Sequence, residues 1–351
     1  MPGVAWFFLL LIDKKEVKIK ALVTGASGHL GYHICKLLSS EDYIVKAFVR
    51  SSSYTEHLSH LPVEVCFGDV FDFGTLKNAM EGVDVVFHTA ALYKLTEAGK
   101  KEKETKDDLI IRTATEGTKN LYHAAFETGV KKIIYTSSVE TVGLAYSKNK
   151  LLDETHYFHG DFYLYTIAKI ESEKIALNLS EKYNLPTVVC NPSTIIGKDD
   201  YKLTPSNSML LNIARFSLFY VDGGQSLVDV EDVARGHLCA LSNGKNRERY
   251  ILSGENTEMK DLSIMIRNIM DTKGPLLKLH KFLLYPAAFV LKVTSGITKK
   301  EPFITVSKVS RGVGSYSYYD FSKARRELGY LPKKLSETLP LTLSWLAERY
   351  K

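Results

Sequence analysis

The sequence predicts an α/β fold in which a doubly wound parallel sheet of about seven strands is joined to a smaller C-terminal lobe. From Lys18 onward, short β-branched runs alternate with helical stretches, which is typical of a parallel sheet covered by helices. Most of these runs are continuously apolar, as expected for strands buried on both faces. The 351 residues, 45% of them hydrophobic, suffice for one large core and a smaller lobe.

The predicted elements follow one another in a regular order. Candidate strands occupy residues 19–23, 44–49, 63–67, 83–88, 132–136, 187–190 and 249–252. Helices are expected near residues 30–39, 75–80, 109–128 and 163–183. Residues 192–225 should form loop and short helix, and residues 228–241 a helix whose first turn Asp229 and Asp232 would cap. The tail from residue 276 should be helical, and its apolar segment 282–291 should be a buried helix.

Composition argues against several classes of partner. The net charge of +6 is mild, and charges of both signs are interleaved even in residues 94–108. This pattern favours a solvated loop over a nucleic-acid surface. The cysteines are far apart, without metal-ligand spacing, and predict reduced core residues of a cytoplasmic protein. These are Cys35, Cys66, Cys190 and Cys239. We therefore expect no nucleic-acid partner and no metal.

The N-terminal segment stands outside this pattern. Residues 4–12 (VAWFFLLLI) are nine consecutive apolar residues, too few to span a bilayer. The segment also lacks the basic flank and small-residue cleavage site of a signal peptide. A membrane-touching anchor, an added strand and an extension from an upstream start codon all remain open. We expect residues 1–17 to be an apolar extension, with no firm membrane signal.

A glycine-rich loop joins the first predicted strand to the first helix. Residues 24–31 read TGASGHLG. In a dinucleotide-binding loop, Gly25 would permit the tight turn, Gly28 the approach of the pyrophosphate, and Gly31 the close packing of helix on strand. The helix N-terminus would attract the phosphates. The other expected cofactor contacts in this loop are Ser27, His29 and Leu30.

The end of the second strand bears on which dinucleotide binds. An acidic residue here would hold the ribose hydroxyls of NAD, but the chain has Arg50 followed by three serines. A guanidinium group pairs with a 2′-phosphate, whereas a carboxylate would repel it. The sequence therefore predicts NADP(H) rather than NAD(H).

Two further strand ends carry candidate cofactor contacts. Asp69, followed by Val70, could accept a hydrogen bond from the adenine amino group. Thr89, Ala90 and Ala91 are small and would leave room for a cofactor against the backbone. Their position supports a role in cofactor binding, because open α/β sheets bind ligands at the carboxyl ends of successive strands.

The candidate catalytic residues follow the fifth strand. Ser138 lies at its end, and Tyr165 and Lys169 are spaced four residues apart, so that they share one face of a helix. A nearby ammonium group lowers the pKa of a phenol, which can then transfer a proton as a hydride moves at the adjacent carbon. Ser138 could hydrogen-bond the same carbonyl oxygen.

Together these motifs resemble a known family. In chain order they are TGASGHLG, VFHTAA, YTSSVETVG, YTIAK, NPSTIIG, LVDVEDVARGHLCA and RERYILSGEN. They are similar to the extended short-chain dehydrogenase/reductases of the NAD-dependent epimerase/dehydratase superfamily, especially the dihydroflavonol 4-reductase-like branch. That branch includes hopanoid-associated sugar epimerases and aldehyde or cinnamoyl reductases. The resemblance covers residues 18–351 and leaves out only the first 17.

The resemblance implies a Rossmann sheet and assigns roles. Ser138, Tyr165 and Lys169 would be catalytic, and Pro192, Ser193, Thr194 and Ile195 would run beside the nicotinamide. Residues 18–192, with a return at 226–255, would form the NADP-binding domain, and residues 193–225 and 256–351 the substrate lobe. One departure is Ala114, where the family usually has an asparagine that supports proton relay.

Three functions remain open at this point. The first is an NADPH-dependent reductase of an aldehyde or ketone, favoured by Arg50. The second is a sugar-nucleotide epimerase or dehydratase that recycles its cofactor. The third is a non-catalytic redox-sensing protein, which the presence of both Tyr165 and Lys169 disfavours. The substrate is a small carbonyl compound or a sugar nucleotide, and a homodimer is left open.

Overall fold

The computed structural model describes residues 18–90, 106–158, 164–286, 309 and 312–350. Seven parallel strands form the main sheet in the order β3-β2-β1-β4-β5-β6-β10. Their bounds are β1 (Lys20–Thr24), β2 (Ile44–Val49), β3 (Val63–Phe67), β4 (Val85–His88), β5 (Lys132–Thr136), β6 (Thr187–Pro192) and β10 (Arg249–Leu252). This order, which reverses direction beside β1, is that of a doubly wound Rossmann sheet and confirms the predicted fold.

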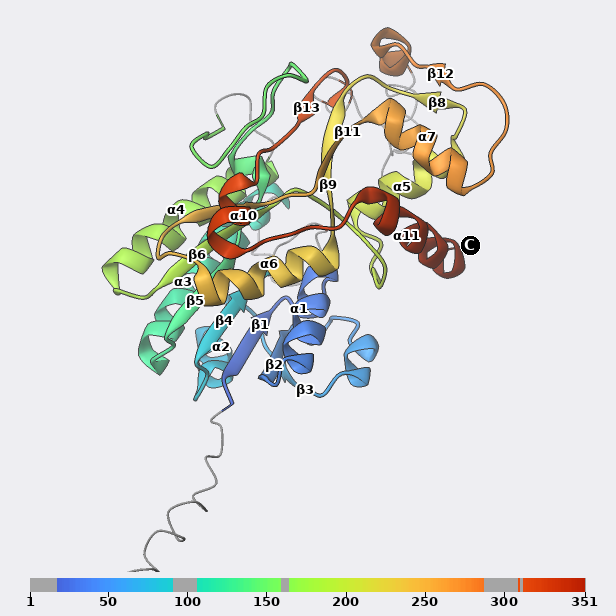
Figure 1. Ribbon diagram of the computed structural model, residues 1–351. Helices are drawn as coiled ribbons and strands as arrows, with labels where there is room; N and C mark the ends of the chain where they lie inside the picture. The colour runs from blue at the N-terminus through green and yellow to red at the C-terminus, as the bar shows by residue number, and fades with distance from the viewer. Residues whose placement is uncertain (1–17, 91–105, 159–163, 287–308, 310–311, 351) are drawn as a thin grey trace, which may run out of the picture.

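Helices cover both faces of the sheet (Figure 1). One face packs against α1 (His29–Ser40), α6 (Val230–Asn243) and α10 (Ser322–Leu328). The other packs against α2 (Phe73–Met80), α3 (Lys106–Thr128) and α4 (Leu164–Lys182). Successive strand residues alternate between these cores: Ala21 and Val23 belong to the first, and Leu22 to the second. Both faces of β1 are therefore apolar, as its unbroken apolar run predicts.

A second, smaller body of structure lies beyond the carboxyl ends of the strands (Figure 1). Its strand β9 (Gly224–Asp229) pairs with β7 (Thr194–Ile196), β11 (Glu255–Glu258) and β13 (Tyr316–Ser317). Helices α5 (Pro205–Arg215), α7 (Met259–Ile269) and α11 (Leu335–Arg349) share a separate leucine-rich core with β7 and β9. A short pair, β8 (Phe219–Tyr220) and β12 (Leu277–Lys278), completes the set.

The helix expected at residues 228–241 begins two residues later than predicted. Val228 belongs to β9, and α6 starts at Val230. Asp229 caps the helix as predicted, because its carboxylate accepts a hydrogen bond from the Glu231 N–H at 2.8 Å. Asp232 does not cap: its carboxylate accepts instead from the Lys333 N–H at 2.7 Å. That interaction ties α6 to the C-terminal segment.

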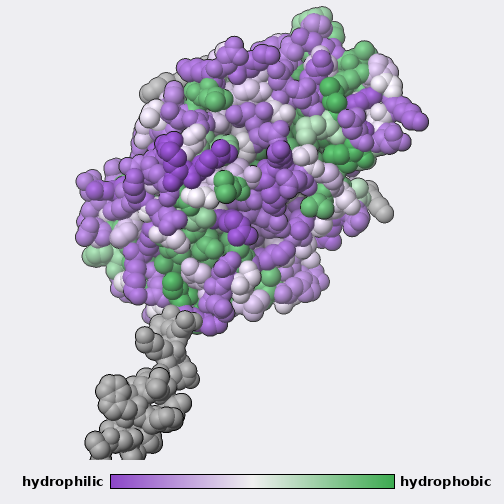
Figure 2. Space-filling model, in the orientation of Figure 1, coloured by the Kyte–Doolittle hydropathy of each residue, from purple (hydrophilic) through white to green (hydrophobic). Residues whose placement is uncertain are grey.

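The described part of the apolar segment 282–291 is helical through residue 286, as predicted, but this helix is not buried. Phe282 is 68% exposed and Leu283 51% exposed, while Leu284 is buried. They extend a surface on which α7, β8 and β12 also expose apolar side chains, seen at the upper right of Figure 2. Residues 287–291 and the extension at 1–17 lie outside the described residues. None of the described helices is both long and apolar enough to cross a membrane.

The four cysteines are unpaired, but only two of them are core residues. Cys35 and Cys190 are buried, and burial raises the pKa of each thiol. Cys66 and Cys239 are only partly buried. Cys66 lies on β3, the edge strand of the sheet, where one side has no neighbouring strand to cover it.

Candidate active site

The loop between β1 and α1 approaches a neighbouring strand end so closely that side chains are excluded. Gly25 has a φ of +72°, and a Cβ there would lie 2.9 Å from the Ala90 backbone. A Cβ on Gly31 would collide with the Gly25 carbonyl group. No side chain caps the first turn of α1, so its backbone N–H groups face the loop without a side-chain acceptor.

A cavity of about 490 Å³ runs from this loop along the carboxyl ends of the strands. Its volume is in the range of small-molecule sites, roughly 300–1,000 Å³. The predicted site residues that line it are Gly25, Ser27, Gly28, His29, Leu30, Gly31, Arg50, Asp69, Val70, Thr89, Ala90, Ser138, Lys169, Pro192, Ser193 and Ile195. Positions scattered over 170 residues of sequence thus meet at one cavity.

Three predicted residues are not on this wall. Thr194 does not line the cavity, and its hydroxyl donates to the Gln225 side chain at 3.2 Å. Tyr165 lines a smaller neighbouring cavity, which shares Lys169 with the large one. Ala91 lies outside the described residues.

One end of the large cavity is positively charged. Arg50 follows β2, and Ser52, Ser53 and Tyr54 come directly after it on the same wall. Lys202 reaches this end from the loop between β7 and α5. Lys202 was not predicted as a site residue, because it lies far along the chain in a segment assigned to the substrate lobe. No local motif marks it.

At the other end, Lys169 is buried and firmly held. Its Nζ donates to the Thr136 carbonyl at 2.9 Å. Burial lowers the pKa of Lys169 to about 8, and the carboxylate of Glu173 opposes this shift. Lys169 is therefore mostly charged at neutral pH, but it releases its proton more easily than an exposed lysine does.

His88 lies beside Lys169 as a neutral, buried imidazole. Its Nδ1 is 2.8 Å from the Thr24 hydroxyl. Burial, and to a lesser degree the charge of Lys169, lowers its pKa to about 3. The ring lines both the large and the small cavity. It is a site residue that the sequence analysis did not single out.

The small cavity has a volume of about 30 Å³ and lies where the sequence departs from the family pattern. Ala114 lines it together with Tyr165, Lys169, Tyr135 and Ser172. The short side chain of Ala114 leaves space in which a single water molecule would fit. Ala114, which replaces the usual asparagine, therefore lies next to Tyr165 and Lys169, the predicted proton-transfer pair.

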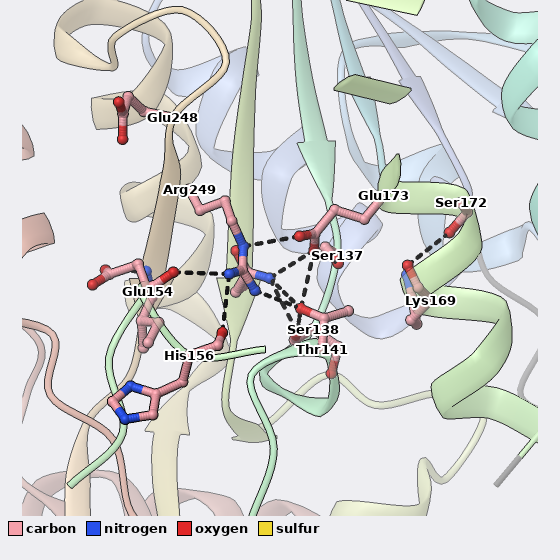
Figure 3. A network of polar contacts seen from close by, with 12 residues as sticks. Ser137, Ser138, Thr141, Glu154, His156, Lys169, Ser172, Glu173, Glu248 and Arg249 are labelled. Carbon is pink, nitrogen blue, oxygen red and sulfur yellow. Dashed lines mark hydrogen bonds and ion pairs between the residues drawn. The ribbon is translucent and has the colours of Figure 1, made fainter. Parts of the chain in front are cut away.

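A buried ion pair lies behind Lys169 and the end of β5. Glu173 follows Lys169 by one helical turn on α4, and Arg249 is the first residue of β10. The Arg249 Nε lies 2.8 Å from the Glu173 carboxylate, and the two side chains are only 6% and 4% exposed. Figure 3 shows the guanidinium and carboxylate groups facing each other next to the strand end.

Both terminal nitrogens of the Arg249 guanidinium also donate hydrogen bonds. Its Nη1 donates to the backbone carbonyls of Glu154 at 2.8 Å and His156 at 3.2 Å, and its Nη2 to the Thr141 hydroxyl at 2.9 Å. The Tyr157 ring covers the guanidinium at 4.3 Å. A buried charge with this many partners has its desolvation cost largely offset.

The same network fixes the backbone that carries Ser138. The Ser137 hydroxyl donates to the Glu173 carboxylate. The Asn191 amide donates to the Glu173 carboxylate at 3.0 Å and to the Ser138 carbonyl at 3.1 Å. The ion pair, the strand end and the neighbouring strand β6 thus form one connected unit (Figure 3).

Among the described residues, no group of three His, Cys, Asp or Glu side chains could hold a metal ion. His156 pairs with Asp153 at 2.8 Å within its own loop. His159 lies outside the described residues.

Comparisons with known proteins identify the family. Residues 21–253 match the model of the NAD dependent epimerase/dehydratase family. The chain is 31% identical to a Synechocystis sp. protein whose provisional name is dihydroflavonol 4-reductase, over 92% of this chain and 93% of that one. It is 27% identical to sterol demethylase protein B of Methylococcus capsulatus, over 93% and 98% of the two chains. The solved structure of gox2253 superposes with a TM-score of 0.80 at 35% identity, covering 94% and 99%.

The sheet order, the glycine-rich loop and the cavity define a Rossmann-type dinucleotide enzyme fold. The chain belongs to the NAD-dependent epimerase/dehydratase family, within the extended short-chain dehydrogenase/reductases. Members of this family are enzymes, which removes the hypothesis of a non-catalytic sensor.

Proposed function

We propose that this enzyme is an NADPH-dependent reductase of an aldehyde or ketone, with Tyr165 as the general acid. The observation that carries the proposal is the arrangement of the catalytic end. Ser138 and Lys169 line the cavity that begins at the glycine-rich loop, and Tyr165 lies one helical turn from Lys169. Their functional roles are those that the sequence motifs predict.

The residues present fit a dinucleotide cofactor. A Cβ at Gly25 or Gly31 would fill the cradle that the pyrophosphate needs, and the first turn of α1 offers N–H groups. Arg50 stands at the end of β2, where the adenosine ribose would lie, and favours NADPH over NADH. When bound, the nicotinamide would supply the hydride.

The chain's own residues would handle the proton. Tyr165 would donate its phenolic proton to the oxygen of the carbonyl substrate, and the Ser138 hydroxyl would donate a hydrogen bond to the same oxygen. Lys169, charged below pH 8, would stabilise the resulting phenolate. Its hydrogen bond to the Thr136 carbonyl keeps the ammonium group from turning away.

We also propose that residues 193–225 and 256–351 form most of the substrate lobe, around a Rossmann domain of residues 18–192 and 226–255. Ser193, Ile195 and residues 203–206 lie on the cavity wall and support this division. Three parts depart from this division: Lys202 lies at the cofactor end, α10 packs against the main sheet, and β9 pairs within the smaller sheet.

Sugar-nucleotide epimerisation or dehydration is the second candidate, because the matched family includes both reactions. A turnover screen of carbonyl compounds and UDP-sugars, with NADPH or NADH followed at 340 nm, distinguishes the two. A reductase consumes one NADPH for each carbonyl reduced. Conversion of a UDP-sugar without net change at 340 nm would contradict the reductase proposal.

A further inference from the structure

A lysine from a distant segment lies beside Arg50 at the cofactor end. Lys202 lies in the loop between β7 and α5, and its Nζ donates to the Ser27 hydroxyl at 2.9 Å, although 175 residues separate the two. Ser27 belongs to the glycine-rich loop. The cavity wall at this end is therefore built from three segments, which contribute Ser27, Arg50 with Ser52 and Ser53, and Lys202.

The two cations lack acidic partners. Neither Arg50 nor Lys202 forms an ion pair with a carboxylate among the described residues. Several other lysines of the chain do form such pairs. Burial and then the charge of Arg50 lower the pKa of Lys202, and no carboxylate raises it. Two neighbouring positive charges without a counter-charge favour binding of an anion.

Aromatic rings hold this end of the cavity in place. The nearest carboxylate, that of Asp199, acts on His57 but pairs with Lys36 at 3.3 Å, and Arg349 lies 5.8 Å from the Tyr201 ring. His57 is buried with a pKa of about 4, lowered by burial and by Lys202, so its ring is neutral at pH 7. It stacks between Tyr54 at 5.5 Å and Tyr201 at 4.6 Å. Tyr201 directly precedes Lys202, so this stack anchors the backbone that carries the lysine. The rings form a neutral support beside the two cations.

We propose that Lys202 is a specificity-determining residue that binds the 2′-phosphate of NADPH together with Arg50. The proposal rests on the proposed NADPH dependence and deepens it. The second cation comes from the loop between β7 and α5, far along the chain from the glycine-rich loop and Arg50. A phosphate dianion accepts charge-assisted hydrogen bonds from an ammonium and a guanidinium group at once. NADH has a neutral hydroxyl group in place of this phosphate and would therefore gain much less from Lys202 at this position.

The loop that carries Lys202 also leads into the substrate side. Its Lys198 carbonyl lies 2.8 Å from the His29 ring and 3.1 Å from the His33 ring, which fixes the loop on α1. Residues 203–206, directly after Lys202, lie on the cavity wall at the start of α5. Binding of the 2′-phosphate would therefore hold the entrance to α5, and NADPH should protect residues 198–206 from hydrogen exchange more strongly than NADH does.

The test uses Lys202→Met, which keeps the aliphatic stem and removes the charge. Binding of NADPH, NADH, 2′,5′-ADP and 5′-AMP is measured by fluorescence or calorimetry. We expect NADPH and 2′,5′-ADP to bind at least about tenfold more weakly, as for other charge-assisted contacts, with NADH and 5′-AMP unchanged. Arg50→Ala should weaken the same two ligands by about ten- to a hundredfold. Lys202→Arg should restore most of the affinity.

Lys198→Met is the matched control, since it removes a positive charge from the same loop. Lys198 pairs with Glu231 at 3.2 Å and does not line the cavity, so all four affinities should be retained. If Lys202→Met leaves 2′,5′-ADP binding intact while Arg50→Ala weakens it, the role of Lys202 is wrong and the NADPH preference stands. If the wild-type enzyme binds 5′-AMP as tightly as 2′,5′-ADP, the NADPH proposal itself fails. An equal loss for NADH and NADPH in Lys202→Met would show a structural role and overturn the inference.

Discussion

The two ends of the cavity are built on opposite electrostatic principles. At the catalytic end, Glu173 and Arg249 are almost fully buried, and every charge has partners. At the cofactor end, Arg50 and Lys202 line the cavity wall and have no carboxylate partner among the described residues. The charges of Glu173 and Arg249 neutralise each other within the protein, whereas those of Arg50 and Lys202 are available to a ligand.

The two ends should therefore affect different properties: one the stability of the fold, the other the affinity for the cofactor. A buried ion pair that loses one partner leaves an uncompensated charge, which is strongly destabilising. An exposed cation that is removed costs the protein little and reduces ligand binding instead. We therefore expect substitutions in the Glu173–Arg249 pair to lower stability, and substitutions of Arg50 or Lys202 to alter only cofactor preference.

The largest effect should follow from breaking the buried pair. Glu173→Gln leaves the guanidinium of Arg249 without its counter-charge and should lower the free energy of unfolding by about 3–5 kcal/mol. Urea denaturation measures it. The control is Glu127→Gln, because Glu127 pairs with Lys77 at 2.7 Å with both side chains more than 40% exposed. That loss should stay below about 1 kcal/mol. Similar small losses for both variants would contradict the proposed contrast.

The next largest effect should be on turnover, with no change in the stability of the fold. Tyr165→Phe removes one hydroxyl from the small cavity and should reduce turnover by at least about 10²-fold, while NADPH affinity stays intact. Lys169→Ala should reduce both, and Ser138→Ala only turnover. Steady-state kinetics with cofactor titration separates the three. Near-normal turnover by Tyr165→Phe would mean that the proton comes from another group.

A smaller effect should appear as a pH dependence. The pKa of Lys169 is lowered from 10.5 to about 8, so the ammonium is present below pH 8 and is lost as pH rises through that value. Carbonyl reduction should then decline by about tenfold per pH unit above pH 8, because the phenolate of Tyr165 loses its stabilising charge. The measurement is kcat/KM between pH 6.5 and 9.5, with NADPH binding followed in parallel. A flat profile to pH 9.5 would be inconsistent with this role.

The smallest effect is expected for removal of residues 1–17, which precede the first strand of the dinucleotide-binding fold in sequence. A chain that begins at Lys18 lacks the apolar extension but keeps β1 and the Lys18–Asp42 ion pair at 2.9 Å. Its turnover and thermal midpoint should match those of the full chain. Insolubility or loss of activity on truncation would show that residues 1–17 pack against the enzyme.

The main sheet was predictable because its strands are short, mostly apolar runs that alternate with helical stretches. The glycine-rich loop, Ser138 and Lys169 were also predictable, since each lies at a strand end or on one helix face. The start of α6 was misjudged because Val228 is apolar and fits either a strand or a helix. The spacing of Glu173, four residues after Lys169, could have drawn attention to it.

Two features were beyond sequence reasoning. Arg249 reaches Glu173 only because β10 pairs with β6 at the edge of the sheet, and Lys202 reaches Ser27 only through the path of a loop. Both contacts depend on tertiary geometry that no local pattern encodes. The exposure of Phe282 is a similar case, because an apolar run does not reveal which neighbours are available to cover it.

The position of β10 in the chain has a consequence for synthesis on the ribosome. Glu173 is made 76 residues before Arg249. At roughly 5–20 residues per second, its helix exists for several seconds before the matching guanidinium leaves the ribosome. Through that interval the carboxylate has to remain hydrated, because burying it alone would be too costly. The catalytic half of the cavity is therefore completed late in translation, after the glycine-rich loop and Arg50 have already been made.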